Sequence, residues 1–283
     1  MDSQTVFVPP EGRTPDPRYI VPGLLRGLQI LRTFSRERQE QTIAELARAV
    51  RIPRSTAFRI VYTLEAAGFL RRAVDGTRYQ LGSPVLELGH SYLAGKELID
   101  IANPVLRRLR DETLASSHLA VREGRDVVYI ARFQGNTSLV SAKNVGSHLP
   151  AHGTAPGRVL LSALPLSEVV ALYEGYEFVT YTKDTPDSIG SLVSLVERDR
   201  KESSIVSWGF YEAEVASIAA PIRNSDGKVE AAISVSCPIS VYEREVFMSR
   251  IRRIVEEAAA EISAGLGYRR AASATVAKAS SAA

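Results

Sequence analysis

The chain has 283 residues, of which 45% are hydrophobic, so it can bury the cores of one large or two ordinary domains; we favour two. It contains no run of about 18 apolar residues, and its N-terminus lacks the basic start and apolar centre of a signal peptide. We therefore expect a soluble, cytoplasmic protein with no membrane partner. A single cysteine, Cys237, excludes an internal disulfide framework and a cysteine-based zinc site, and we expect no cofactor or metal.

Positive charge is concentrated near the N-terminus. The net charge of the whole chain is +3, but residues 20–82 contain eleven arginines, no lysine and five acidic residues, a net charge of +6. This pattern is typical of a segment that neutralises phosphate groups. Charge alone fits a solvated surface equally well.

The N-terminal third of the chain is predicted to form helices that follow a flexible segment. Residues 1–19 hold four prolines and few aliphatic side chains, so we expect them to be flexible. A first helix starts at Val21. Thr42, followed three residues later by Glu45, predicts a capping box at the start of a second helix.

The stretch "IPRSTAFRIVYTLEAAGFL" predicts a third helix directly after a tight turn. Pro53 ends the second helix and suits the first turn of the next one. The apolar side of this helix recurs at helical spacing, and its members are Ala57, Ile60, Val61 and Leu64. After Gly68, "FLRRAVDGTRYQL" predicts two short strands around an Asp75-Gly76 turn. Residues 20–82 are thus predicted to form a winged helix-turn-helix.

The polar side of the third helix is our candidate DNA-binding surface. A helix of this diameter fits the major groove, and its N-terminal residues would approach base edges or phosphates first. Arginines of the hairpin would clamp the adjacent backbone. The candidate residues are Arg51, Arg54, Ser55, Thr56, Arg59, Tyr62, Arg71, Arg72 and Arg78. The competing interpretation is a solvated helix in a bundle.

The remaining chain changes character. Ser83 and Pro84 begin a linker helix over residues 83–97, whose apolar side suggests pairing with another subunit. Residues 98–268 alternate strands and helices, with hairpins closing at Glu123-Gly124-Arg125 and Ser225-Asp226-Gly227, "TSLVSAKNV" as a further strand and an amphipathic helix at the end. We expect an antiparallel α+β domain there, and a disordered tail over 269–283.

A polar spot for a small molecule is predicted in this second domain. Ser234 and Ser236 share one face of the last strand, and Ser217 lies in its hairpin partner. The turn "HGTAPG" leaves N–H groups free at a helix start, where a carboxylate is stabilised. Together these features suit a small organic acid. The alternative is that backbone groups satisfy the three buried hydroxyls.

Four segments in this order and spacing resemble the IclR family of bacterial transcriptional regulators, from about Val21 to Tyr268. They are "TIAELARAVRIPRSTAFRIVYTLEAAGFL", "YQLGSPVLELG", "LPAHGTAPGRVLLSAL" and "IAAPIRNSDGKVEAAISVSCPIS". The resemblance implies an N-terminal winged helix-turn-helix, a linker helix and a C-terminal GAF-like effector domain. It also implies homodimers, often paired into tetramers, on palindromic operators.

The resemblance also implies an effector pocket. Its residues, by matching position, are Ala155, Pro156, Ser217, Ser234 and Ser236, joined by Leu139 and Ser141. The family's pocket receives an acidic side chain from a loop, which is shorter in this chain. Glu212 and Glu214 are both candidates for that place here.

The sequence favours a transcription factor, a repressor of a catabolic operon that senses a small organic acid, for which we favour an aromatic acid. An activator of the same type, a constitutive architectural DNA binder and a hydrolase are the alternatives. A hydrolase would use Ser217 or Cys237 with a histidine, and the four histidines are His90, His118, His148 and His152. The chain has no G-x-S-x-G, H-E-x-x-H or nucleotide-binding motif, so we expect no enzyme.

Overall fold

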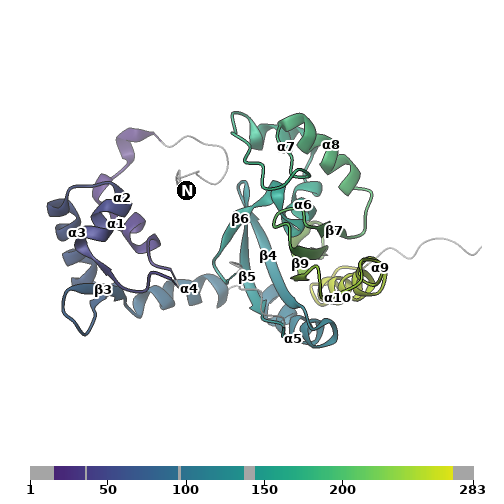
Figure 1. The fold of residues 1–283 in the computed structure, drawn as a ribbon, viewed down its shortest axis with the longest axis horizontal. Coiled ribbons are helices and arrows are strands. Elements are labelled where there is room, and N and C mark those ends of the chain that lie inside the picture. The colour runs from purple at the N-terminus through teal and green to yellow at the C-terminus, as the bar shows by residue number, and fades with distance from the viewer. Residues whose placement is uncertain (1–15, 36, 95–96, 137–143, 270–283) are drawn as a thin grey trace, which may run out of the picture. The chain divides into compact units, whose positions relative to one another are not determined.

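The computed structural model describes residues 16–35, 37–94, 97–136 and 144–269 of the chain. These residues divide between two compact units, 16–94 and 97–269 (Figure 1). Each unit has a hydrophobic core of its own. Within the described residues, no helix combines the length and the apolar composition needed to cross a bilayer.

The first unit is a helix-turn-helix with a small sheet. Its three-stranded antiparallel sheet has the order β1-β3-β2. A 3-10 turn at Pro17–Tyr19 precedes the helices. The elements are α1 (Pro22–Arg32), β1 (Gln41–Thr42), α2 (Ile43–Val50), α3 (Arg54–Ala66), β2 (Leu70–Arg72), β3 (Arg78–Leu81) and α4 (Pro84–Ala94).

Local chemistry sets the helix boundaries. The Thr42 hydroxyl accepts a hydrogen bond from the Glu45 N–H at 3.3 Å, and the Glu45 carboxylate accepts one from the Thr42 N–H at 2.7 Å. This is the predicted capping box. Arg51 ends α2 in the left-handed conformation, with φ of 56°. Pro53 then precedes α3, so the predicted tight turn is present.

Helices α1, α2 and α3 and strands β2 and β3 each contribute a large side chain to one core of the first unit. The buried residues are Ile30 from α1, Leu46 from α2, Val61 from α3, Leu70 from β2 and Tyr79 from β3. The hairpin turn follows the predicted chemistry, since Gly76 has φ of +69°. Two residues, Gln41 and Thr42, form a third strand that is too short for a sequence pattern to reveal.

The second unit is built on a six-stranded antiparallel sheet with the order β6-β5-β4-β9-β8-β7. Both predicted hairpins are present, β4–β5 and β8–β9. Residues 137–143, which include most of the predicted strand "TSLVSAKNV", lie outside the described residues. The strands are β4 (Ser116–Glu123), β5 (Asp126–Phe133), β6 (His148–Pro150), β7 (Ile205–Trp208), β8 (Val215–Arg223) and β9 (Val229–Pro238).

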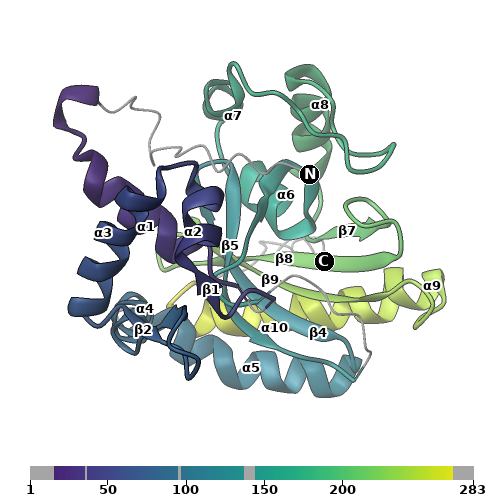
Figure 2. The same cartoon turned by 60° about the vertical axis from the view of Figure 1, so that its left-hand side comes forward.

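Helices cover both faces of this sheet (Figure 2). On one face lie α5 (Glu97–Thr113) and α10 (Arg252–Gly265), and on the other α6 (Ala155–Ser162), α7 (Leu166–Tyr173) and α8 (Ile189–Asp199). The sequence analysis did not separate α5 from the linker. It also predicted one final helix, whereas the chain forms α9 (Arg244–Val246), a π-helical turn (Phe247–Ile251) and α10.

The core on the α6 side positions the pocket described below. Val159 and Leu161 of α6 are buried with Tyr129 of β5 and Ala219 of β8. Cross-strand pairs place Ser217 opposite Ser236 and Ala219 opposite Ser234, so these serines share the face that α6 covers.

Candidate functional site

Helix α3 separates a buried side from a charged side, as predicted. Ala57 and Val61 are completely buried in the first unit. On the outward side, Arg54, Ser55 and Arg59 are exposed, and Tyr62 keeps 63% of its surface accessible. Thr56 is half-buried. Within the part of this unit that the structure describes, neither Arg54 nor Arg59 forms an ion pair, so both charges are available to a polyanion.

The hairpin arginines differ from one another. Arg72 donates from Nε to the Glu65 carboxylate at 2.8 Å, and its guanidinium lies 5.4 Å from the centre of the Tyr79 ring. Arg78 lies 3.7 Å from Asp75. Arg71 is exposed and donates to the neutral amide oxygen of Gln80 at 3.3 Å.

Arg51 differs from the arginines of α3 and the hairpin, because it also ends helix α2. Its backbone forms the left-handed C-cap of α2, and its side chain is exposed. The predicted DNA-binding residues therefore all belong to one unit, but the acidic partners of Arg72 and Arg78 reduce the charge that these two offer.

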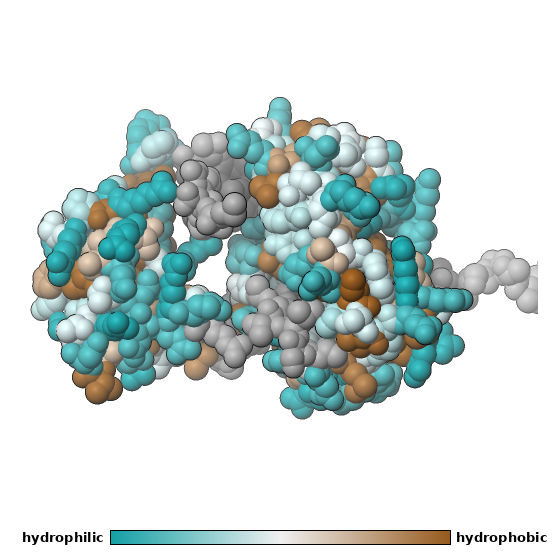
Figure 3. Space-filling view, in the orientation of Figure 1, coloured by the Kyte–Doolittle hydropathy of each residue, from teal (hydrophilic) through white to brown (hydrophobic). Residues whose placement is uncertain are grey.

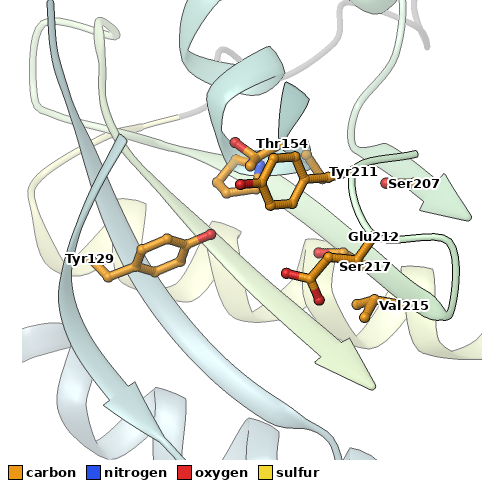
Figure 4. A pocket seen from close by; sticks show the side chains of 9 residues that line it. Tyr129, Thr154, Ser207, Tyr211, Glu212, Val215 and Ser217 are labelled. Atoms are coloured by element: carbon orange, nitrogen blue, oxygen red, sulfur yellow. The ribbon is translucent and has the colours of Figure 1, made fainter. Parts of the chain in front are cut away.

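A narrow pocket lies in the second unit, between the start of α6 and the sheet (Figure 4). About 300 Å³ at this site is free of protein atoms when the open solvent at its mouth is counted, and the enclosed space is close to that of one water molecule. Its walls come from β5, α6, β7, β8 and the loop before β8. The lining residues are Tyr129, Thr154, Ala155, Pro156, Ser207, Tyr211, Glu212, Val215 and Ser217.

The start of α6 forms one wall. The Thr154 hydroxyl caps the helix by accepting a hydrogen bond from the Gly157 N–H at 3.3 Å. Ala155 and Pro156 follow as the first two helical residues. A Cβ on Gly157 would lie 2.2 Å from the Ala151 carbonyl oxygen, so only glycine allows the two backbone segments to approach this closely. Because Pro156 has no N–H, the Ala155 N–H is the one backbone donor among the pocket-lining helical residues.

Glu212 faces the phenol groups of this pocket. Figure 4 shows the Tyr129 hydroxyl and the Glu212 carboxylate pointing into the same space. Burial, followed by the nearby Glu212 charge, raises the pKa of Tyr129. Burial and the neighbouring Tyr181 and Glu212 raise the pKa of Tyr211 to about 12. Both phenols therefore stay protonated and can donate hydrogen bonds.

The loop that carries Glu212 is held in place from outside the pocket. The Thr182 and Thr185 hydroxyls donate to the Phe210 carbonyl at 2.6 Å and 2.9 Å. The Arg158 guanidinium lies 4.6 Å from the centre of the Phe210 ring, and it also forms a buried ion pair with Asp199. These contacts fix the two residues that follow Phe210.

The structure thus separates the predicted effector residues into three groups. Ala155, Pro156, Glu212 and Ser217 line the pocket, whereas Glu214 is exposed and does not. Ser234 and Ser236 are buried on the same face of the sheet without lining the pocket. Leu139 and Ser141 lie outside the described residues.

Five lining residues were not predicted. Thr154 lies inside the quoted turn and is an N-cap residue type, so the cap pattern could have revealed it. Tyr129 and Ser207 follow from strand alternation only once the strand order is known. Tyr211 and Val215 flank the short loop, and no local signal marks them as pocket residues.

The two residues proposed as nucleophiles of a hydrolase lie on different faces of the sheet. The Ser217 hydroxyl donates to the Val235 carbonyl at 2.9 Å. Cys237 is buried and pairs with Ala216, which places it on the opposite face of the sheet from Ser217.

Two family descriptions match the two units. Residues 23–73 match the IclR helix-turn-helix domain, and residues 90–264 match the C-terminal region of the bacterial transcriptional regulator IclR. The chain belongs to the IclR family. It is therefore a DNA-binding transcriptional regulator with an effector-binding domain, and the predicted fold class, α+β with an N-terminal winged helix-turn-helix, is confirmed.

Regulators of several bacteria are similar to this chain over most of its length. The Pca regulon regulatory protein of Pseudomonas putida is 31% identical over 250 residues, covering 88% of this chain and 85% of its own. XynR of Escherichia coli is 29% identical over 249 residues, covering 88% and 98%. The repressor AllR of Salmonella typhi is 27% identical over 246 residues, covering 87% and 90%.

Solved structures show the same fold. A transcriptional regulator from Rhodococcus sp. RHA1 superposes with a TM-score of 0.75 at 32% identity, covering 87% of this chain and 98% of its own. An IclR homologue from Microbacterium hydrocarbonoxydans, solved in complex with 4-hydroxybenzoate, has a TM-score of 0.74 at 27% identity, covering 86% and 98%.

Proposed function

We propose that this regulator is a repressor of a catabolic operon and that a small organic acid, bound by its second unit, controls it in the cytoplasm. The proposal rests on one observation. The chain combines a pocket that carries Glu212 with a helix-turn-helix in which Arg54 and Arg59 form no ion pair among the described residues. The similarity to AllR, a repressor, supports repression over activation.

DNA binding is assigned to the exposed side of α3 and to the hairpin. Arg54, Ser55, Thr56, Arg59 and Tyr62 would read the major groove, and the remaining candidates would contact phosphates. Arg71 is the strongest phosphate ligand of the hairpin, because Arg72 and Arg78 have acidic neighbours. Arg51 would contact phosphate from the end of α2.

We propose that the protein acts as a homodimer, or as a dimer of dimers, on a palindromic operator. Helix α4 supports pairing, because three large apolar side chains are exposed on it: Leu86, Leu88 and Tyr92, with 76%, 62% and 51% of their surfaces accessible. A two-fold dimer would present two copies of α3 to two half-sites.

A gel-shift titration against the DNA upstream of its own gene tests this function. We expect the full chain to bind that fragment more tightly than random duplex at moderate salt. Arg59→Ala is expected to lose about 1–3 kcal/mol of discrimination between the two duplexes, because it removes a base contact. Arg253→Ala, which removes an exposed arginine from the second unit, is the matched control and should bind as the wild type does.

Equal affinity for the upstream fragment and for random duplex would contradict the proposal. Unchanged discrimination by Arg59→Ala would contradict the role given to that side chain alone.

The pocket chemistry suits an acid that carries a hydroxyl group at its far end. The Ala155 N–H and the two phenols can donate to a carboxylate, and α6 presents its positive end there. Glu212 can only accept, so it favours a ligand that donates a hydrogen bond to it. The 4-hydroxybenzoate complex of the Microbacterium protein supports this ligand class.

Calorimetry with 4-hydroxybenzoate and with benzoate distinguishes the contacts of the ligand's hydroxyl group from those of its carboxylate. We expect Glu212→Gln to weaken 4-hydroxybenzoate binding by about 1.5–3 kcal/mol, the value of a hydrogen bond to a charged group, with little effect on benzoate. Glu214→Gln, which changes the exposed acid two residues later, is the control and should leave both affinities unchanged. No binding heat with either acid would argue against this effector class.

Effector binding would change DNA affinity only if the effector prefers one conformation of the dimer. The shift in operator affinity cannot exceed that difference in effector affinity. A gel-shift with saturating 4-hydroxybenzoate therefore tests repression directly, since release of the operator is the outcome expected for an inducer.

A further inference from the structure

Helix α3 exposes an aromatic pair that neither the core nor the arginines explain. Phe58 and Tyr62 have 50% and 63% of their surfaces accessible. Their rings stack with centroids 6.4 Å apart and planes at 28°. Figure 3 shows hydrophobic surface over α1 and α3, bordered by hydrophilic side chains. A contiguous exposed apolar patch of this kind marks a contact surface.

The pair lies beside the basic side of the helix. Phe58 follows Arg54 by four residues and precedes Tyr62 by four, so the three side chains lie in one row along the helix. Arg59 borders the row. The row turns away from Ala57 and Val61, which fill the core.

We infer that Phe58 and Tyr62 contact the 5-methyl group of thymine in the operator's major groove, which makes them specificity-determining residues. The inference rests on the proposed entry of α3 into that groove. The thymine methyl is the apolar group that a base pair presents there, and an apolar side chain that covers it distinguishes T·A from the other pairs.

Charge favours DNA over a second copy of the chain as the occupant of this surface. Phe58 and Tyr62 also line an apolar groove that α1 completes with Leu24 and Leu28. A two-fold contact through the α3 side of that groove would bring Arg54 and Arg59 of both copies together, and the one acidic residue of α3, Glu65, already pairs with Arg72. A duplex supplies phosphates to the arginines and methyl groups to the rings at once.

Replacing thymine by 2′-deoxyuridine tests the inference, because it deletes the methyl group and leaves the hydrogen-bonding edge intact. The probe is a duplex selected from a randomised pool by the full-length protein, with its thymines replaced one at a time. At one or two positions per half-site we expect the affinity to fall about fourfold, the value of one buried methyl-sized group. Phe58→Ala and Tyr62→Ala should bind the thymine and uracil duplexes at those positions equally.

Leu24→Ala provides the matched control, since it alters the α1 wall of the same groove without touching the row. It should keep the uracil sensitivity of the wild type. Sedimentation should show the same mass for the wild type, Phe58→Ala and Leu24→Ala.

Uracil tolerance at every position, with selection of the duplex intact, would overturn the inference and leave the proposed DNA binding standing. A lower mass for Phe58→Ala would also overturn it, because the surface would then hold a second copy. Failure to enrich any sequence from the pool would instead count against the proposed function itself.

Discussion

The imidazole of His152 lies inside a cluster of aromatic rings, two residues before the Thr154 cap of the pocket. The rings of Tyr173, Tyr176 and Phe178 surround it with centroids 5.8, 5.5 and 5.4 Å away. The side chain is completely buried. Burial lowers the pKa of His152, and a contact with the backbone of Val179 offsets part of that effect.

This histidine is predicted to make the protein less stable in mild acid. Its pKa is lower in the folded than in the unfolded state, so the unfolded state binds more protons once the pH falls below about 6.5. The free energy of unfolding should therefore decrease as the pH is lowered from about 7 towards 5. Urea denaturation at a series of pH values measures it.

His152→Phe should flatten that dependence, because it keeps an aromatic ring in the cluster and removes the proton-binding site. His148, which lies 3.9 Å from Asp126, is present in both proteins, so its contribution cancels in the comparison. Parallel curves for the variant and the wild type would show that His152 does not carry the effect.

At the scale of single elements, the hairpin shows that neighbouring residues decide whether an arginine is available to bind a phosphate. Arg71 and Arg72 are adjacent in β2, yet only Arg72 pairs with Glu65 of α3. Arg72 and Glu65 keep 51% and 27% of their side-chain surfaces accessible, so this pair adds little stability. It does hold the Arg72 guanidinium against protein rather than leaving it to a phosphate.

We predict that Arg71→Ala weakens operator binding more than Arg72→Ala. The slope of log affinity against log salt should fall by about 0.9 in Arg71→Ala, the contribution of one phosphate contact, and by less in Arg72→Ala. Gel-shift titrations at several salt concentrations give both slopes. Equal losses would show that binding to DNA breaks the Arg72–Glu65 pair.

The elements that repeat a local pattern were predictable. The capping box at Thr42, the turn at Pro53 and the hairpin at Asp75-Gly76 depend on residues a few positions apart. Strands β1, β6 and β7 were missed, because they are two to four residues long and, unlike the equally short β2 and β3, have no predicted turn that joins them to a neighbour. Helix α5 was missed because its pattern follows the linker with almost no break.

At the scale of the whole molecule, the two units have hydrophobic cores that share none of the described residues. One core holds the helix-turn-helix with its arginines, and the other holds the sheet and the pocket. Each candidate site therefore has its own stable scaffold. An effector changes DNA binding only if it prefers one of two conformations of the protein, and in our proposal these are two conformations of the dimer.

The sequence by itself determined the family, the winged helix-turn-helix, the two hairpins and the charged side of α3, because caps, turns and periodicities are encoded by neighbouring residues. Only the tertiary structure decided that Glu212 and not Glu214 lines the pocket, that Tyr129 and Tyr211 join it, and that Arg72 is paired. These outcomes depend on contacts between distant segments, such as those that Thr182 and Arg158 make with Phe210. No local pattern records which of two nearby acids a fixed loop turns inward.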